Sequence, residues 1–380
     1  MLSSSNALKL GYYQVGNQVH LNKISALIDG TKRNIHPQWI FNNEIFDKFD
    51  WSIEPQESLQ ELYAQRAREI RNTYDYIVLA YSGGSDSENV FNTFVKNNLR
   101  IDEIYTSFPM EMAEKKGADQ WDYSSANQLS EWELTVKPKL KWIRQNYPEI
   151  KITCYDWAQG YEQYKIDDDF ALVRDNNLAY FTDQRWSLEK VPSIDKKLNQ
   201  IKNSILLTGT CKPRLCLQDN TYKLYFIDQI KHGTTYELNL DRTVWFYWHP
   251  HAAKIISKQS HEIIKFFEKN PVFKQYIQWP QTPRARDFYE SAIRAIIYPD
   301  QNLNYFQGSK WPNFNFAWDT VLMTVDPAMD DKLRFHLRES MQGLHKIIDD
   351  KYFQKNRNGE QLTGFITGMY PIAKESVILK

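Results

Sequence analysis

The sequence predicts an α/β protein with a Rossmann-like core on a parallel sheet, followed by an α-rich C-terminal extension. Residues 76–81 form an unbroken apolar and aromatic run that is too short for an ordinary helix and is typical of a buried strand. A glycine pair follows, and apolar residues then recur at helical spacing over 90–95. Residues 101–106 predict a second strand, which completes a β-α-β unit. Because such units are right-handed, the two strands are expected to lie parallel and adjacent.

The remaining elements follow in order. Helical spacing over 58–74 predicts a helix beside the first strand, with Arg66, Arg68 and Arg71 expected on a solvated face. A helix kinked near Pro138 is expected over 123–146. Further strands are expected at 150–155 and 203–208, and C-terminal helices at 253–268, 285–297 and 331–352. The expected parts of the chain are an irregular N-terminal segment packed on the core (1–56), an α/β domain (57–235) and an α-rich covering region (236–380).

Composition excludes several classes of protein. Lys+Arg and Asp+Glu each number 47 among 380 residues, so no global charge attracts nucleic acid or a membrane. Hydrophobic residues make up 42%, which is enough for a packed core. Three cysteines are too few for a disulfide framework, and neither a signal segment nor an 18-residue apolar run occurs. We therefore expect a cytoplasmic protein without membrane contact.

The turn after the first strand has the chemistry of a phosphate site. It reads Ser-Gly-Gly-Ser-Asp-Ser over residues 82–87. Gly83 and Gly84 let the backbone turn sharply and approach a ligand, and the following helix N-terminus favours an anion. Hydroxyl groups donate to phosphate oxygens, while a carboxylate suits a hard cation that also takes phosphate ligands. The alternative is a plain strand-to-helix turn. The G-x-x-x-x-G-K-[ST] and G-x-G-x-x-G motifs do not occur.

This turn matches the Ser-Gly-Gly-x-Asp-Ser signature of the PP-loop ATP pyrophosphatases, so the chain resembles that superfamily of adenine nucleotide alpha-hydrolase-like proteins. The resemblance implies a HUP-type core, ATP and Mg²⁺ as ligands, and cleavage of ATP to AMP and pyrophosphate with adenylation of a substrate oxygen. It also implies that Asp86 binds Mg²⁺. The residues that it implies for pyrophosphate are Ser82, Gly83, Gly84, Ser85 and Ser87.

A second apolar strand also runs into a glycine turn, in which Gly209 is followed by Lys212 and Arg214. This segment resembles the second nucleotide loop that many PP-loop enzymes carry. Lys212 would supply a point charge for phosphate, and Arg214 could hold an anion with two parallel hydrogen bonds. The alternative is a surface turn before a hairpin that turns at Asp219 and Asn220. The two interpretations are compatible.

Several other polar residues are candidates for a role in binding or in packing. Tyr105, Thr106 and Ser107 lie at the carboxyl end of the second strand, where doubly wound folds bind ligands, and are candidates for adenine or ribose contacts or ordinary loop residues. The carboxylates at 167–169 are expected to be solvated. For His249, His251 and His261 we expect capping or packing rather than metal binding, since no supporting ligand spacing accompanies them.

The predicted chemistry is amide or C–N bond formation, in which a nitrogen nucleophile attacks the carbon that bears the adenylated oxygen and displaces AMP. Asp86 and Lys212 are the expected catalytic residues, since Mg²⁺, the loop N–H groups and Lys212 would stabilise charge on departing pyrophosphate. The acceptor, a small molecule or a nucleic acid, is not specified. Sulfur transfer through Cys211 and Cys216 and a non-catalytic ATP-binding regulatory module remain alternatives. Sulfonucleotide reduction is disfavoured, because no cysteine follows Cys216.

Overall fold

The chain is described by a computed structural model. The expectations for 123–131, 167–169, 285–288, 290–291 and 331–342 lie outside the described residues. The described residues are 6–21, 23–108, 110, 132–156, 198–209, 211–228, 242–280, 289, 292–298, 343–356 and 359–375.

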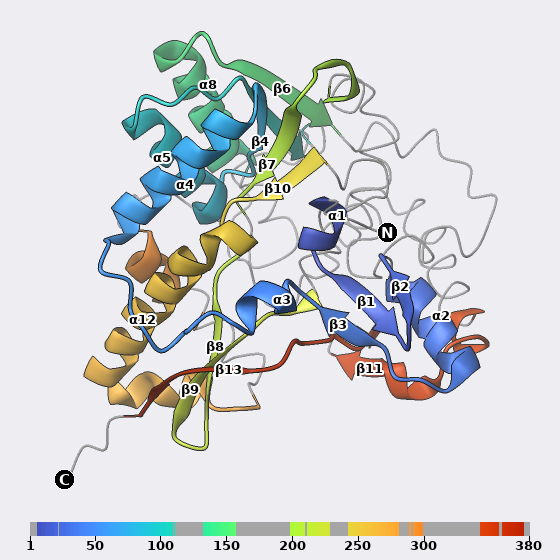
Figure 1. The fold of residues 1–380 in the computed structure, drawn as a ribbon. Coiled ribbons are helices and arrows are strands. Elements are labelled where there is room, and N and C mark those ends of the chain that lie inside the picture. Colours follow the sequence, from blue (N-terminus) through green and yellow to red (C-terminus); the bar gives the residue numbers. More distant parts are fainter. Residues whose placement is uncertain are drawn as a thin grey trace.

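Five parallel strands form the central sheet, in the order β10-β7-β4-β5-β6 (Figure 1). Of these five strands, β4 comes first along the chain and lies in the middle of the sheet. The next two strands extend the sheet on one side of it, and the last two extend it on the other. This is the order of doubly wound nucleotide-binding sheets, and it confirms the predicted α/β class. The strands are β4 (Tyr76–Ala80), β5 (Glu103–Phe108), β6 (Lys151–Asp156), β7 (Ser204–Thr208) and β10 (Thr243–Trp245).

Three helices lie side by side on one side of this sheet (Figure 1). They are α4 (Leu59–Thr73), α5 (Ser85–Lys96) and α8 (Lys137–Asn146). Ser58 and Glu61 form a capping box that starts α4, as the helical spacing there predicts. The expected kink near Pro138 takes another form: a π-helical turn, η1 (Trp132–Val136), precedes α8, and the proline lies in the first turn of α8, where a missing N–H is tolerated.

The expectation of a solvated arginine face on α4 is wrong for Arg66. Its exposed fraction is 5%. The guanidinium donates to the backbone carbonyls of Trp245 and Phe246, each at 3.3 Å, and pairs with Glu69 at 2.9 Å. Trp245 and Phe246 lie at the end of β10 and directly after it, in an aromatic stretch that packs against α4. Their backbone carbonyls are buried there and need hydrogen-bond donors. Helical spacing alone cannot reveal a partner about 180 residues away.

The N-terminal segment packs on the core as expected, but the expectation that it is irregular is wrong. It contains a three-stranded antiparallel sheet, ordered β2-β1-β3. The ring of Phe41 lies 5.8 Å from the rings of Trp245 and Trp248, which joins this segment to the core. Its strands have only three or four residues, too few to show an alternating pattern. The elements are α1 (Asn6–Lys9), β1 (Tyr12–Val15), β2 (Gln18–His20), α2 (Lys23–Arg33), β3 (Gln38–Ile40) and α3 (Asn43–Phe46).

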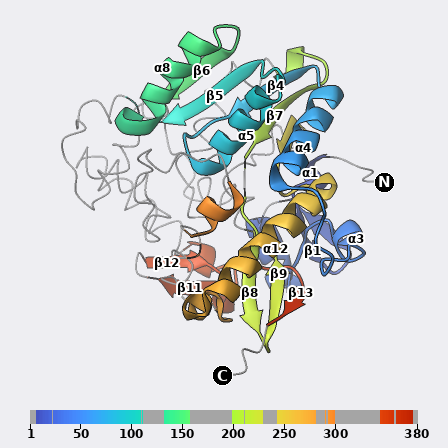
Figure 2. The same cartoon turned by 90° about the vertical axis from the view of Figure 1, so that its left-hand side faces the viewer.

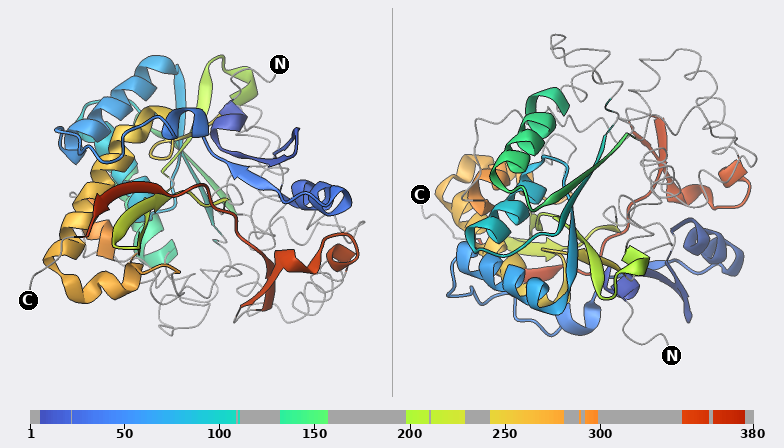
Figure 3. Two further views of the ribbon diagram at one scale, coloured as in Figure 1. Left: turned by 60° about the horizontal axis from the view of Figure 1, so that its bottom comes forward. Right: turned by 90° about the horizontal axis from the view of Figure 1, so that it is seen from above.

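The hairpin predicted after the second glycine turn is confirmed. Strands β8 (Arg214–Gln218) and β9 (Thr221–Tyr225) pair antiparallel. They are joined by Asp219 and Asn220, whose φ angles are 52° and 54°, as a two-residue hairpin turn requires. Strand β13 (Tyr370–Lys374) pairs with β9, so residues near the C-terminus complete a second antiparallel sheet on the side of α12 (Figure 3).

The described C-terminal region combines helices with strands that the sequence did not predict. Helix α12 (Ala253–Lys269) confirms the helix expected at 253–268. The helix expected to reach residue 352 ends earlier: α-helical structure stops at 345 and a 3-10 turn, η8, precedes β11. The other elements are η6 (Pro250–Ala252), η7 (Pro271–Ile277), η8 (Asp350–Tyr352), β11 (Phe353–Asn356) and β12 (Gly359–Leu362). No described helix has the length and apolar character needed to cross a bilayer.

His249 has the capping role expected for it. Its Nδ1 accepts a hydrogen bond from the backbone N–H of His251 at 3.2 Å, at the start of η6. Burial, together with the positive charge of Arg66, lowers the pKa of His249 to about 2. The folded protein therefore keeps this imidazole neutral at a pH where an unfolded histidine takes up a proton.

We expect this histidine to make the protein less stable in acid. The unfolded state binds more protons below pH 6.5, the ordinary histidine value, so stability is fully present above it and falls as pH decreases towards 2. One proton that only the unfolded state binds lowers the free energy of unfolding by about 1.4 kcal/mol for each pH unit of acidification. His249→Asn keeps an acceptor but cannot titrate, so its free energy of unfolding should fall less steeply. Denaturant titrations at neutral and mildly acidic pH measure this, and identical slopes would contradict it.

Candidate functional site

The two glycine turns begin at the same edge of the sheet. Ala80, the last residue of β4, pairs with Thr208, the last residue of β7. The loop after β4 (82–87, the first loop) and the loop after β7 (209 and 211–214 as described, the second loop) therefore start side by side. They lie where the strand order reverses, which is where doubly wound sheets bind ligands.

The two loops touch through their backbones. A Cβ atom on Gly209 would lie 2.8 Å from the carbonyl carbon and oxygen of Asp86 and 2.9 Å from the N atom of Ser87. Gly83 has a φ of +71°, and a Cβ there would lie 2.9 Å from Cγ2 of Val136. Glycine is therefore required at Gly83 by conformation and at Gly209 by contact. The second loop therefore adjoins the first.

Hydroxyl groups shape the first loop. Ser87 Oγ donates to the Gly84 carbonyl at 3.1 Å and accepts from the Ser82 N–H at 3.3 Å. Ser82 Oγ accepts from the Gly84 N–H at 3.4 Å. Gly84 is the N-cap of α5, so the N–H groups of the first helical turn, from Ser85 onwards, have no acceptor within the helix. Together with the helix dipole, these donors can hold an anion.

Asp86 and Lys212 meet across the two loops. Lys212 Nζ lies 2.6 Å from Oδ1 and 2.8 Å from Oδ2 of the carboxylate. The Asp86 side chain is 27% exposed and that of Lys212 is 10% exposed. The two residues proposed from sequence as catalytic are therefore neighbours, although 126 positions separate them.

Tyr298 completes this cluster and was missed by the sequence analysis. Its hydroxyl donates to Asp86 Oδ1 at 2.7 Å, and Lys212 Nζ lies 5.9 Å from its ring centroid. Tyr298 is 1% exposed. Burial, followed by the charge of Asp86, raises the pKa of Tyr298 well above its ordinary value, so the phenol remains a donor. Tyr298 lies one residue beyond the helix predicted at 285–297, so helical spacing gave no signal for this role.

Two further tyrosine hydroxyls donate hydrogen bonds to the backbones of the first and second loops. Tyr247 donates to the Asp86 carbonyl at 3.2 Å and accepts from the Asn89 side chain at 2.7 Å. Tyr289 donates to the Pro213 carbonyl at 2.6 Å, next to Lys212 in the second loop. The C-terminal region thus contacts both loops.

The segment that carries Tyr298 is itself held in place. It lies between α5 and α12, coloured orange in Figure 2. Tyr63 of α4 donates to the Ile297 carbonyl at 2.7 Å, and Gln259 of α12 donates to the Tyr63 hydroxyl at 2.8 Å. Tyr63 and Gln259 are buried. These bonds fix the position from which Tyr298 reaches Asp86.

The candidates for adenine or ribose contacts lie on β5 rather than in the loops. Tyr105 pairs with Ala80 and packs with the cluster of Val78 on the face of the sheet. Thr106 is 1% exposed, and its hydroxyl has no hydrogen-bond partner in the described part of the chain. Ser107 is a residue of the strand, paired with Tyr155. Their proposed role stays a prediction.

Arg214 and the two nearby cysteines lie at the start of the hairpin that follows the second loop, and the anion-binding role of Arg214 stays a prediction. Arg214 is the first residue of β8, and its guanidinium donates to Cys211 Sγ at 3.9 Å. Cys211 lies outside the strand, as a shared sulfur site would need. Burial, however, raises the pKa of Cys216 to about 11, and this thiol lies 4.0 Å from Met369 Sδ. A buried thiol of high pKa is a poor sulfur carrier.

The groups around Asp86 suit a magnesium ion that binds this carboxylate and the phosphates of a ligand together. Mg²⁺ is usually held by one or two carboxylates together with substrate phosphates and water. The Asp86 carboxylate, the N-terminus of α5 and the cradle closed by Gly209 supply that arrangement. Within the described ranges, no group of three or more histidine, cysteine or acidic residues could hold a metal by itself. His261, which bonds the Trp51 carbonyl at 3.1 Å, is a packing residue as expected.

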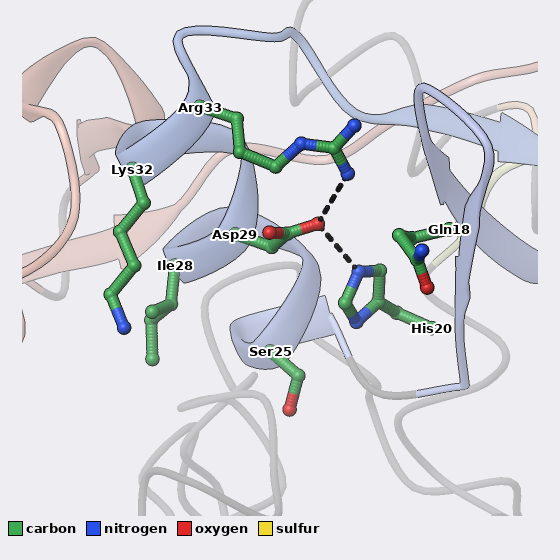
Figure 4. Close-up of a pocket in the computed structure, with 7 residues that line it drawn as sticks. All are labelled: Gln18, His20, Ser25, Ile28, Asp29, Lys32 and Arg33. Atoms are coloured by element: carbon green, nitrogen blue, oxygen red, sulfur yellow. Dashed lines mark hydrogen bonds and ion pairs between the residues drawn. The ribbon is translucent and has the colours of Figure 1, made fainter.

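A pocket of about 610 Å³ lies elsewhere, beside β2 and α2 (Figure 4). Asp29 at its edge accepts from His20 at 3.0 Å and from Arg33 at 3.2 Å. Arg33 also donates to the Val15 carbonyl at 3.0 Å. These bonds join α2 to the N-terminal sheet, so they have a structural role. The pocket is lined by Gln18, His20, Ser25, Ile28, Asp29, Lys32 and Arg33.

Comparison of the chain with models of protein families, with curated proteins and with solved structures found no match.

Proposed function

We propose that the chain is a PP-loop enzyme with a HUP-type core that cleaves ATP to AMP and pyrophosphate in the presence of Mg²⁺. A substrate oxygen is adenylated, and a nitrogen nucleophile then displaces AMP, which makes the reaction of the ligase or amidation type. The first loop binds the β- and γ-phosphates, and the second loop closes the site beside it.

The observation that carries this proposal is the contact of Asp86 with Lys212, at 2.6 and 2.8 Å, where two glycine turns meet at the carboxyl edge of a parallel sheet. Sites that bind magnesium together with a polyphosphate commonly place a metal-binding carboxylate and a phosphate-binding cation within a few ångströms of each other. A plain strand-to-helix turn needs neither the partly buried charge pair nor the absence of a side chain at Gly209.

Each residue has a distinct part in the proposed reaction. Ser82 and Ser85, with the backbone N–H groups of the first loop, donate to phosphate oxygens and orient pyrophosphate as the leaving group. Ser87, whose hydroxyl donates to the Gly84 carbonyl, keeps the loop in the shape that binds pyrophosphate. Lys212 balances the negative charge that develops on the departing pyrophosphate. When bound at Asp86, Mg²⁺ supplies further charge stabilisation for the phosphates.

Tyr247, Tyr289 and Tyr298 keep the loops at a fixed separation. Their hydrogen bonds reach the Asp86 carbonyl, the Pro213 carbonyl and the Asp86 carboxylate, respectively. Because all three are buried, they exclude water from one side of the site. The acceptor, a small molecule or a nucleic acid, would enter from the side that they leave open.

Product analysis with α-labelled ATP tests the proposal. The purified protein is incubated with Mg²⁺ and with separate small-molecule and nucleic-acid fractions of a cell extract. Labelled AMP together with pyrophosphate supports cleavage between the α- and β-phosphates, and the stimulating fraction identifies the class of acceptor. Release of ADP, or tight binding of ATP without any product, would instead favour a nucleotide-binding regulatory module.

Asp86→Asn should reduce AMP formation on the order of 100-fold or more. The amide can still accept from Tyr298, so the local hydrogen bonds are retained while the charge that holds Mg²⁺ is lost. AMP release at saturating Mg²⁺ measures the effect, and circular dichroism checks the fold. Asp219→Asn, the same substitution at a carboxylate of the hairpin turn whose side chain is 82% exposed, is the control for the loss of one charge. Unchanged turnover in Asp86→Asn would remove the metal role of Asp86.

A further inference from the structure

We propose that the Asp86–Lys212 ion pair couples the two ligands of the site: Lys212 leaves Asp86 for phosphate as the carboxylate takes up a divalent cation, so neither ligand binds well without the other. This inference rests on the proposed function of the two loops. It adds that metal and nucleotide must bind cooperatively, which the presence of the residues alone does not require.

The first step of the argument is competition for the same oxygen atoms. Oδ1 of Asp86 accepts from Lys212 at 2.6 Å and from Tyr298 at 2.7 Å, and Oδ2 accepts from Lys212 at 2.8 Å. A carboxylate offers about four lone-pair positions, and three are used by these contacts. A cation bound directly to either oxygen would also lie within a few ångströms of the Lys212 ammonium. Repulsion between the two positive charges therefore opposes binding of the metal while Lys212 stays.

The second step concerns what releases Lys212. Its side chain is 10% exposed, so leaving it without a counter-ion would cost free energy. A polyphosphate held by the first loop offers a replacement anion beside Asp86. The lysine side chain has a flexible four-carbon stem, so its ammonium can change partners without movement of the backbone. Phosphate therefore draws Lys212 away and makes the carboxylate available to the cation.

Tyr298 has a different part in this exchange. Its phenol is neutral, and its backbone is anchored through the bond of Tyr63 to the Ile297 carbonyl at 2.7 Å. It adds no repulsion to a cation and can remain bonded to Oδ1. Tyr298 is thus a positioning residue that orients the Asp86 carboxylate, while Lys212 decides whether the carboxylate is available.

The coupling is measured with Mn²⁺ alone as the probe, titrated by the paramagnetic resonance signal of the free ion. The wild-type protein should bind Mn²⁺ weakly. Lys212→Met, which keeps the length of the side chain, should bind it about 10-fold more tightly, within the range of coupling between linked ligands. Asp86→Asn combined with Lys212→Met should lose this gain. Tyr298→Phe is the matched control: it removes a bond to the same carboxylate but leaves the Lys212 charge, so Mn²⁺ binding should stay weak.

A second titration uses α,β-methylene-ATP, which cannot be cleaved between the α- and β-phosphates. In the wild type its affinity should rise about 10-fold when Mn²⁺ is added, and in Lys212→Met this dependence should be smaller. Mn²⁺ affinity unchanged by Lys212→Met, or a gain that persists with Asp86→Asn, overturns the coupling alone if the analogue still binds. Absence of analogue binding at every Mn²⁺ concentration overturns the proposed function and the coupling with it.

Discussion

Gly209→Ala should abolish most activity at the loops and also destabilise the protein. The added Cβ would lie 2.8 Å from the backbone of Asp86, closer than nonbonded atoms approach. The backbone conformation of Gly209 lies outside the left-handed region, so alanine is tolerated conformationally and the effect is purely one of contact. Forcing the loops apart should cost about 1–3 kcal/mol. Because catalytic geometry tolerates little displacement, AMP formation should fall on the order of 100-fold.

Gly368→Ala is the matched control for this substitution. A Cβ at Gly368 has no heavy atom within 4 Å, and its φ also lies outside the left-handed region. Its unfolding midpoint and AMP formation should stay near those of the wild type. Binding of α,β-methylene-ATP and denaturant titrations are measured on both variants. Equal behaviour of Gly209→Ala and Gly368→Ala would show that the contact between the loops has no part in the site.

The local features of the site could be predicted because the chain encodes them within a few residues. The apolar run of β4, the glycines of the first loop and the spacing in α5 together define a strand, a turn and a helix. The hairpin turn at Asp219 and Asn220 is equally local. The meeting of Gly209 with Asp86, in contrast, comes from the structure, in which parallel strands bring the loops at their carboxyl ends to one edge.

The other features depend on segments that are distant in the sequence. Tyr298 reaches Asp86 from 212 positions away, and nothing in its own surroundings in the sequence distinguishes it from a core tyrosine. Arg66 sits on an amphipathic helix, and only the fold reveals the carbonyls of Trp245 and Phe246 that bury it. Spacing identifies faces of helices and strands, whereas partners across the structure are chosen by packing.

One such long-range pair should dominate the stability of the N-terminal part. Lys23 at the start of α2 and Asp228 after β9 form an ion pair of 2.9 Å, with side chains 2% and 0% exposed. The Tyr13 hydroxyl donates to the same Asp228 oxygen at 2.9 Å, and the Asp228 N–H donates to the Phe365 carbonyl at 3.0 Å. The cluster joins β1, α2, the end of β9 and the segment before β13.

Asp228→Ala should therefore destabilise the protein by about 3–5 kcal/mol, because it leaves Lys23 buried without a counter-ion. The double variant Lys23→Met/Asp228→Leu removes both charges and fills the space, so it should be less destabilised than Asp228→Ala. Glu57→Ala is the control: Glu57 pairs with Lys254 at 2.7 Å, but the Lys254 side chain is 59% exposed, so solvent screens the pair and the unfolding midpoint should hardly move. Guanidinium titrations compare all three. A double variant no more stable than Asp228→Ala, or an Asp228→Ala midpoint equal to that of Glu57→Ala, would mean that this buried pair does not hold the N-terminal sheet on the core.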